Sequence, residues 1–316
     1  MPDVVTLGET MALFAPREVG PLRYVSDFRL KFGGAETNFA TALVRLGISA
    51  GWISRLGADE LGAFIAHNLR GEGVDVSRVV HDKDAPTALY VKELSAVGDT
   101  TVYYYRRGSA ASRLAPDDLD TGYVTGARWL HVTGITPALS DSCRATVERA
   151  VEMARDAGLE VSFDPNLRLK LWTVERAREV LFPILRRSTV LLGGMEEYTA
   201  LLNLTDADEA ADWGLEQGVK VAVVKLGADG ALIATPEERR VVPPFPVPRV
   251  VDPVGAGDGF DAGFVAGQLM GWDLWESGRL GNVVGAHAIM VNGDYEGYPT
   301  LSEARAYMAG EAKIGR

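Results

Sequence analysis

Apolar and polar positions along this 316-residue chain follow two periods. Short runs rich in β-branched residues predict buried strands, and apolar residues spaced three or four apart predict helices. The predicted strands or extended pieces are 4–8, 12–15, 22–32, 50–56, 87–93, 100–107, 129–133, 159–163, 189–192, 220–224 and 230–234; the predicted helices are 35–46, 61–72, 141–157, 174–187, 208–217, 258–271 and 275–292. From residue 129 onward the two kinds mostly alternate, which favours a mainly parallel sheet flanked by helices.

The extended pieces before residue 110 predict a second, smaller sheet. The runs 87–93 and 100–107 are joined around Gly98-Asp99, a hairpin signal. With the early extended pieces they form a unit that would serve as a lid over a ligand. We therefore expect an α/β core made of residues 1–10, 34–85 and 111–316, and a β lid made of residues 11–33 and 86–110.

Composition narrows the classes of partner. The formal charge is −11, from 32 basic and 43 acidic residues, so we expect no nucleic-acid binding, although a few cations can still dominate one pocket. Cys143 is the only cysteine, which excludes an intrachain disulfide and favours a reducing, cytoplasmic location. No apolar run reaches the roughly 18 residues of a membrane span, so we expect no membrane partner.

The segment Asp252-Pro253-Val254-Gly255-Ala256-Gly257-Asp258-Gly259-Phe260 carries the strongest chemical signal. A Gly-rich turn that enters a helix leaves backbone N–H groups without intrahelical partners, beside the positive end of the helix dipole, and so binds anions. Gly255 and Gly257 allow an anion to approach the backbone closely. Asp258 would repel a phosphate there unless it takes a proton from a hydroxyl that attacks phosphorus. An Asp that only caps the helix is the plain alternative.

Other polar clusters follow predicted strands, where open parallel sheets bind ligands. Asn166 is suited to position a metal-bound water or a phosphate, and Arg168 to contact a carboxylate or phosphate through two hydrogen bonds. Residues 225–230 contain two glycines and suit either a nucleotide or a tight turn. Residues 33–38 open a helix with Gly33-Gly34 and suit either a polyol or a hinge.

Residues 103–107, Tyr-Tyr-Tyr-Arg-Arg, gather aromatics and cations on one predicted strand. Alternation places Tyr104 and Arg106 on one face, able to cover a small charged ligand, unless the hairpin is simply solvated. The four histidines have no metal-ligand spacing. The chain also lacks the P-loop, dinucleotide-binding and protein-kinase motifs.

Two of these segments resemble the signatures of a known family. Residues 33–40, with Leu46-Gly47, resemble the N-terminal signature of the ribokinase-like (PfkB) carbohydrate kinases, and residues 252–260, with Ala262-Gly263, resemble the C-terminal one. The resemblance extends along essentially the whole chain. It implies a three-layer α/β sandwich with a mainly parallel central sheet and a small β-sheet lid, and a kinase that uses ATP and Mg²⁺.

Within the family, the chain looks most like members that phosphorylate the sugar acid 2-keto-3-deoxygluconate. The resemblance implies that the substrate is held by Gly34, Asn38, Tyr90, Tyr104, Arg106, Arg168, Asp258 and Asp294. A pair of guanidinium groups makes sense for a sugar acid, because a neutral hexose needs none.

The resemblance also implies a nucleotide site and a catalytic group. ATP would lie along Asn166, Lys225, Leu226, Gly227, Ala228, Asp229, Gly230, Gly255, Ala256 and Gly257, with Asn282 and His287 near the adenine. Asp258 would act as general base on the terminal hydroxyl of the sugar. The backbone N–H groups of Gly255, Ala256, Gly257 and Asp258 would hold the developing charge.

One departure from the family concerns the metal. The family motif Asn-x-x-Glu aligns with Gly194-Met195-Glu196-Glu197, so Glu197 keeps the acidic end while Gly194 has no side chain to replace the Asn. Glu197 would then act on Mg²⁺ indirectly, with a water in place of the Asn.

Two other functions stay open: a kinase of a neutral sugar such as fructose or ribose, and a binding protein without turnover. Exposed edges of the lid sheet predict a homo-oligomer.

Overall fold

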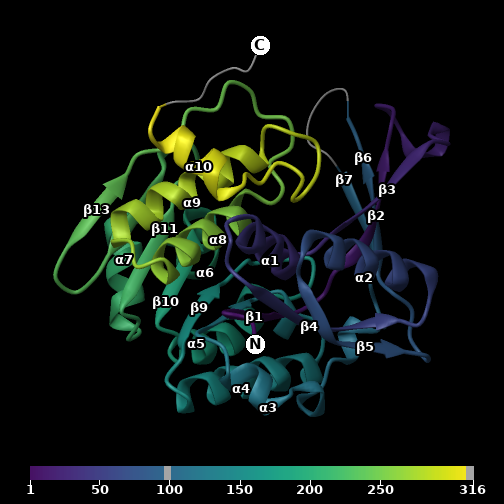
Figure 1. The fold of residues 1–316 in the computed structure, drawn as a ribbon, viewed down its shortest axis with the longest axis horizontal. Helices are drawn as coiled ribbons and strands as arrows, with labels where there is room; N and C mark the ends of the chain where they lie inside the picture. Colours follow the sequence, from purple (N-terminus) through teal and green to yellow (C-terminus); the bar gives the residue numbers. More distant parts are fainter. Residues whose placement is uncertain (96–100, 311–316) are drawn as a thin grey trace.

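The computed structural model describes residues 1–95 and 101–310, and within them the strands form two sheets (Figure 1). The strands are β1 (Val4–Leu7), β2 (Met11–Pro16), β3 (Phe28–Gly33), β4 (Ala50–Gly57), β5 (Asp75–Asp82), β6 (Leu89–Glu93), β7 (Thr101–Tyr105), β8 (Trp129–Thr133), β9 (Glu160–Asp164), β10 (Val190–Gly194), β11 (Val221–Lys225), β12 (Ala231–Ala234) and β13 (Arg239–Val242). The large sheet has the order β13-β12-β11-β10-β9-β8-β1-β4-β5, and the small sheet has the order β3-β2-β6-β7.

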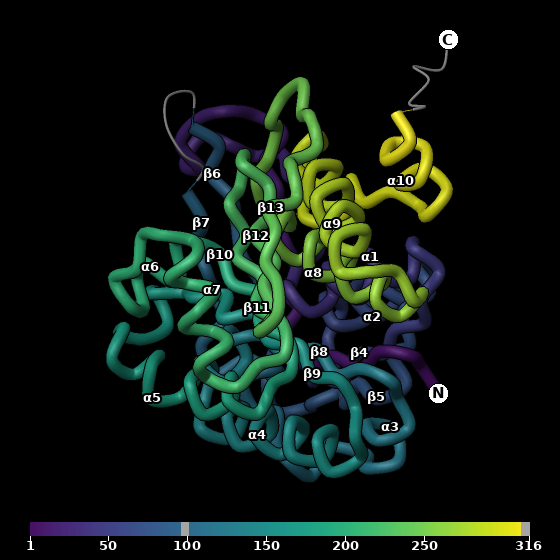
Figure 2. Tube along the Cα trace, turned by 90° about the vertical axis from the view of Figure 1, so that its left-hand side faces the viewer, coloured from purple at the N-terminus to yellow at the C-terminus, as the bar shows by residue number. Residues whose placement is uncertain are grey.

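Helices cover both faces of the large sheet, so the body has three layers (Figure 2). They are α1 (Ala35–Arg45), α2 (Glu60–Glu72), α3 (Thr121–Thr125), α4 (Asp141–Asp156), α5 (Val174–Leu185), α6 (Met195–Leu202), α7 (Ala207–Glu216), α8 (Ala256–Leu269), α9 (Leu274–Ala288) and α10 (Leu301–Met308). Neighbours on one strand point into different cores: Val4 packs in the cluster of Phe39 from α1, and Val5 in the cluster of Val147 from α4. This alternation is what a strand buried on both faces requires.

The predicted α/β class and the mainly parallel sheet are confirmed. Strands β5-β4-β1-β8-β9-β10-β11 pair in parallel, and β11-β12-β13 pair antiparallel. The predicted turn between β11 and β12 is present, with Gly230 at φ 92°, a conformation that favours glycine. Strands β5 and β13 were not predicted, because exposed or half-exposed charged residues interrupt their apolar pattern.

Two predicted elements have different bounds in the structure. The piece predicted as extended over 22–32 begins with a 3₁₀ turn at Leu22–Tyr24, and β3 starts only at Phe28. The turn follows Gly20-Pro21, a pair typical of turns, and the Leu22 N–H is held by Glu93. The last predicted helix, 275–292, ends at Ala288 as α9, ahead of Gly293 with φ 137°.

The small sheet lies at the upper right of Figure 1, apart from the large sheet. Its β6 and β7 pair antiparallel, as expected, while the predicted turn at Gly98-Asp99 lies outside the described residues. Met11, Leu13, Ala15 and Tyr90 share a small apolar core on the face toward the rest of the molecule. Among the described helices, none is long and apolar enough to cross a membrane.

Candidate active site between the two sheets

A cleft of about 770 Å³ separates the small sheet from the carboxyl ends of the large-sheet strands. Asp164 ends β9, Gly194 ends β10 and Lys225 ends β11, and each borders the cleft. Tyr90 and Tyr104 border it from the small sheet. The cleft has the size of a site for a small molecule together with a nucleotide, and it lies where parallel sheets bind ligands.

Residues 252–258, called the glycine loop below, form one wall of the cleft. Gly255 has φ 83°, and a Cβ on it would lie 1.9 Å from the carbonyl oxygen of Asp294. The Tyr298 hydroxyl donates to the Gly255 carbonyl at 2.7 Å. Since α8 begins at Ala256, its first N–H groups have no intrahelical acceptor. The structure therefore has the close-packed, amide-rich turn that the sequence predicts.

Asp258 lies in the first turn of α8 and receives hydrogen bonds from two amide side chains. Its Oδ2 accepts from Nδ2 of Asn38 at 2.8 Å, and its Oδ1 accepts from Nδ2 of Asn166 at 3.4 Å. Burial raises the pKa of Asp258 to about 6, although the Asn38 hydrogen bond acts in the opposite direction. A carboxylate that titrates near neutral pH is well matched to general-base catalysis.

Lys225 connects two acidic residues beneath this turn. Its Nζ lies 3.1 Å from both Asp164 and Asp261. Burial alone would lower the pKa of Lys225, but the two carboxylates outweigh it and raise the pKa. The charge of Lys225 is thus paired with two protein carboxylates, which it neutralises at the floor of the cleft.

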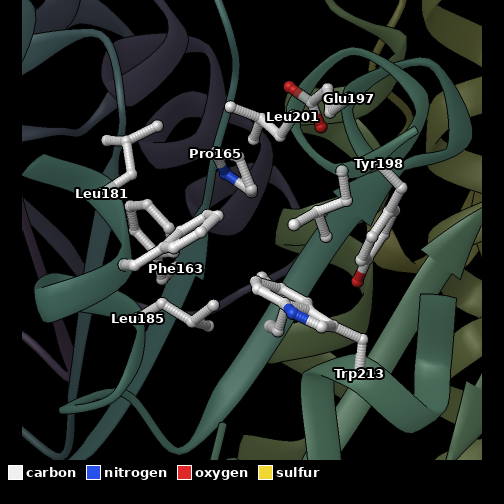
Figure 3. A pocket seen from close by; sticks show the side chains of 11 residues that line it. Phe163, Pro165, Leu181, Leu185, Glu197, Tyr198, Leu201 and Trp213 are labelled. Carbon is white, nitrogen blue, oxygen red and sulfur yellow. The ribbon is translucent and has the colours of Figure 1, made fainter. Parts of the chain in front are cut away.

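Glu197 lies in α6 with both carboxyl oxygens held by the backbone. Its Oε2 accepts from the Gly194 N–H at 2.8 Å and its Oε1 from the Leu167 N–H at 2.7 Å. Burial raises its pKa to about 7, helped by the negative charge of Asp164. Figure 3 shows Glu197 at the rim of an apolar cavity that Phe163 and Trp213 line. With about 10 Å³, that cavity has room for no more than one water, so it is a packing defect of the core.

A second wall of the cleft comes from β6 of the small sheet. The Tyr90 hydroxyl donates to Oδ2 of Asp294 at 2.7 Å. Two residues further along the strand, Lys92 Nζ lies 3.0 Å from Oδ1 of Asp294 and 3.0 Å from Oδ2 of Asp252. Burial raises the pKa of Asp294, which the Lys92 charge partly offsets. The small sheet is thus tied to the body by buried polar contacts.

The two arginines of the cleft have different surroundings. Arg106 donates from Nε to Oε2 of Glu9 at 2.7 Å, its Nη2 lies 2.6 Å from the same oxygen, and Ser109 donates to the other Glu9 oxygen. Arg168, among the described residues, donates only to the Leu167 carbonyl, at 3.4 Å. Arg168 is therefore the arginine with more of its guanidinium available for an anion.

Most of the predicted site residues border this cleft. They are Gly34, Asn38, Tyr90, Tyr104, Arg106, Asn166, Arg168, Glu197, Lys225, Leu226, Gly227, Gly255, Gly257, Asp258 and Asp294. Ala256 lies between two of them at the start of α8.

Five predicted nucleotide-binding residues do not border the cleft in the described structure. Ala228, Asp229 and Gly230 lie in the turn beyond Gly227. Asn282 donates to the carbonyls of Val242 and Pro243, and His287 packs its ring on other aromatic side chains. Their part in nucleotide binding stays a prediction.

The sequence interpretation missed Glu9, Lys92 and Asp261. Glu9 lies two residues after the end of β1, so the rule that placed Asn166 and Arg168 at strand ends could have found it. Lys92 lies two positions after Tyr90, and strand alternation could have placed it on the same face. Asp261 is one helical turn from Asp258 and points into the core with Lys225.

The acidic side chains fit a magnesium ion that a nucleotide brings with it. Among the described residues, no group of three or more His, Cys, Asp or Glu side chains is arranged to hold a metal. Magnesium commonly keeps several waters and binds through substrate phosphates with only one or two carboxylates. Glu197 and Asp164 border the cleft, and because their oxygens already accept from backbone N–H groups or pair with Lys225, they would act on such an ion through water.

The comparisons with known proteins identify the family. Residues 1–301 match the pfkB family of carbohydrate kinases. The chain is 38% identical over 314 residues to the 2-dehydro-3-deoxygluconokinase of Bacillus subtilis (strain 168), covering 99% of this chain and 97% of that protein. It is 37% identical to the 2-dehydro-3-deoxygluconokinase of Thermoproteus tenax, covering 96% of this chain and 93% of that protein.

Solved structures share the fold over nearly the whole chain. A PfkB protein from Polaromonas sp. JS666 has a TM-score of 0.89 at 38% identity, covering 97% of this chain and 100% of that one. A putative ribokinase II from E. coli, in complex with ATP and Mg²⁺, has a TM-score of 0.91 at 26% identity, covering 98% and 100%. The chain therefore belongs to the pfkB family of carbohydrate kinases and has their ribokinase-like α/β fold.

Proposed function

We propose that the protein is an ATP-dependent kinase that phosphorylates the terminal primary hydroxyl of 2-keto-3-deoxygluconate, giving 2-keto-3-deoxy-6-phosphogluconate. This sugar acid is also called 2-dehydro-3-deoxygluconate, the name that the relatives from Bacillus subtilis and Thermoproteus tenax carry. The observation that carries the proposal is the position of Asp258: a half-buried carboxylate that borders the cleft at an amide-rich helix start, with two Asn side chains holding it.

In the proposed reaction Asp258 accepts the proton of the attacking hydroxyl. Asn38 and Asn166 orient its carboxylate, and the N–H groups of residues 255–258 stabilise the charge that develops on the transferred phosphoryl group. The raised pKa of Asp258 makes the carboxylate a stronger base than an exposed Asp, while it remains mostly ionised at neutral pH.

The proposed sugar site lies between the small sheet and the start of α1. Gly34, Tyr90 and Tyr104 line it, and Asp294 is in reach of sugar hydroxyls. Arg168 pairs with the carboxylate of the sugar acid, because more of its guanidinium is available than that of Arg106. A charge-assisted, two-point contact of this kind favours an acid over a neutral sugar.

The proposed nucleotide site runs from Lys225–Gly227 to the glycine loop. Mg²⁺ bound to the ATP phosphates would neutralise their charge, with Glu197 acting through a water. Gly194 leaves room for that water: a Cβ there would come only within 3.5 Å of Glu197 Oε2.

We further propose that residues 11–33 and 86–110 act as a lid and that its outer face joins two copies of the chain. Phe14, Leu30, Val91 and Tyr103 lie in one row across the small sheet, on the face opposite Tyr90 and Tyr104. Leu30, Tyr103 and Tyr105 are exposed. Analytical ultracentrifugation of the full chain would show a dimer, and Tyr103→Lys would shift it toward monomer; a monomeric wild-type protein would contradict this part. A cytoplasmic location stays a prediction.

A substrate panel with ATP and Mg²⁺ tests the proposal. Coupled ADP release should be fastest, as kcat/KM, with 2-keto-3-deoxygluconate. A higher kcat/KM for fructose or ribose would select a neutral-sugar kinase. Saturable binding of the sugar acid by calorimetry without any ADP release would indicate a binding protein that has lost turnover.

A further inference from the structure

Lys92 is a buried cation with a contact pattern that differs from that of an ordinary surface ion pair. It is 3% exposed, and its Nζ lies between two carboxylates, Asp252 and Asp294, at 3.0 Å from each. Burial alone would lower the pKa of Lys92, but the two carboxylates raise it, so the side chain stays charged. A buried ion pair of this kind is strongly destabilised when one partner is removed, because the remaining charges lose their compensation.

Of the two carboxylates that Lys92 joins, Asp252 belongs to the glycine loop and Asp294 to a segment that packs against it. Asp252 begins the loop, and its Oδ1 accepts from the Val254 N–H at 3.2 Å. Asp294 approaches from a different segment, and its carbonyl oxygen is the atom that leaves no space for a side chain at Gly255. Without a cation between them, the two acids would repel each other and push the start of the glycine loop away from the Asp294 segment.

Lys31 offers a matched comparison from the same small sheet. It lies on β3 and also reaches the body, where its Nζ donates to the Asn292 carbonyl at 2.8 Å and pairs with Glu296 at 2.7 Å. Both lysines therefore tie the small sheet to the segment around Asp294. Of the two, Lys92 alone also contacts the glycine loop, through Asp252.

We propose that Lys92 is a positioning residue: it couples the position of the small sheet on the body to the geometry of the glycine loop. The sugar binds against the small sheet, at Tyr90 and Tyr104, while the phosphoryl group is transferred at residues 255–258. When the small sheet is in its place against the body, Lys92 holds Asp252 and Asp294 in position. This in turn sets the position of the loop amides and of Asp258. This inference rests on the proposed kinase function for its kinetic consequences.

The kinetic test compares Lys92→Met with Lys31→Met in the full-length enzyme. Lys92→Met should lower kcat by roughly 10²-fold, the cost of about 1 Å of misplacement in a reacting site, with a far smaller change in the KM of the sugar. Lys31→Met should lower kcat much less than Lys92→Met does. Lys92→Arg should recover most of the kcat, since it restores the cation. Melting temperatures of all variants, with assays run well below them, separate lost activity from unfolding.

A double-mutant cycle identifies the partner through which Lys92 acts. If the loss comes from two uncompensated carboxylates, Lys92→Met combined with Asp252→Asn should lose no more kcat than Lys92→Met alone. If the losses of kcat in Lys92→Met and Asp252→Asn simply add in the double variant, the coupling through Asp252 would be overturned. A large rise in the KM of the sugar acid with unchanged kcat would instead make Lys92 a direct ligand of the substrate carboxylate.

Hydrogen–deuterium exchange gives a readout that needs no sugar. Amides of residues 252–258 should exchange faster in Lys92→Met than in the wild type, and Lys31→Met should leave them unchanged. Equal exchange in the two variants would overturn the inference whatever the substrate is. The wild-type substrate panel alone decides the proposed function, so the two can fail separately.

Discussion

The small-sheet wall and the glycine-loop wall of the cleft differ in the partners of their charged side chains. On the small-sheet wall each cation described above is already paired with protein acids: Lys92 with Asp252 and Asp294, and Arg106 with Glu9. On the glycine-loop wall, Asp258 is held by neutral amides. The difference teaches that one wall is built to keep its shape, while the other presents a carboxylate with neutral hydrogen-bond partners, as the proposed general base requires.

This contrast also separates two arginines that look equivalent in the sequence. Arg106 lies on the small-sheet wall, and its Nε and Nη2 both contact the Glu9 carboxylate. Arg168 comes from the loop after β9 and keeps most of its guanidinium for the cleft. The substrate carboxylate is therefore expected at Arg168, and we expect Arg106 to act mainly by neutralising Glu9.

The largest effect should come from Asp258→Asn, which removes the proton acceptor and keeps the shape. We expect kcat to fall by about 10²–10⁴-fold, the usual contribution of a general base, while the melting temperature stays the same or rises because a half-buried charge is lost. Stopped and coupled assays of ADP release measure the rate. Asp156→Asn, at an exposed site, is the control and should keep full activity. Retained turnover in Asp258→Asn would remove Asp258 from the mechanism.

Substitution of the two arginines should separate binding from stability. Arg168→Met should lower kcat/KM for the sugar acid by about 10–100-fold, as the loss of charged hydrogen bonds predicts, with little change for fructose. Arg106→Met should instead lower the free energy of unfolding by about 3–5 kcal/mol, because Glu9 is left buried without its partner. Urea unfolding and kinetics on both sugars measure the two effects. Equal losses in both variants would show that the two walls are not distinct.

The pH dependence should expose the base on the glycine-loop wall. Asp258 acts only when deprotonated, so kcat/KM should fall as the pH drops through about 6, by about tenfold per unit below it. The Asn38 hydrogen bond lowers the pKa of Asp258, so Asn38→Ala should move this limb to higher pH. A limb that does not move in Asn38→Ala would assign the titration to another group.

The smallest effect should come from Gly194→Asn, which restores the family motif. A side chain at Gly194 meets ordinary contact distances, so stability should change by no more than about 0.5 kcal/mol. The Mg²⁺ concentration for half-maximal activity should fall if an Asn replaces a water there. An unchanged Mg²⁺ dependence would mean that position 194 takes no part in holding the ion.

The sequence was sufficient for the parts of the site that depend on local structure. The glycine loop, Asp258, and the side chains after β9 and β11 follow from turn chemistry and from the rule that ligands bind at strand ends. Pairings between distant segments could not be predicted in this way. Lys92 lies 160 residues from Asp252 in the sequence and Glu9 lies 97 from Arg106, and only the folded chain brings them together. The contacts of Asn282 with the Pro243 carbonyl and of His287 with Tyr307 also join distant segments, and the expected place of these two residues near a nucleotide stays a prediction.

Identification of the product tests the central claim most directly. When the protein is mixed with ATP, Mg²⁺ and 2-keto-3-deoxygluconate, phosphorus NMR should show a phosphomonoester signal correlated with the protons of the terminal carbon, growing in step with ADP. That result would place the phosphoryl group on the hydroxyl that Asp258 is proposed to deprotonate. Release of inorganic phosphate alone, or a phosphate on any other carbon of the sugar acid, would contradict it.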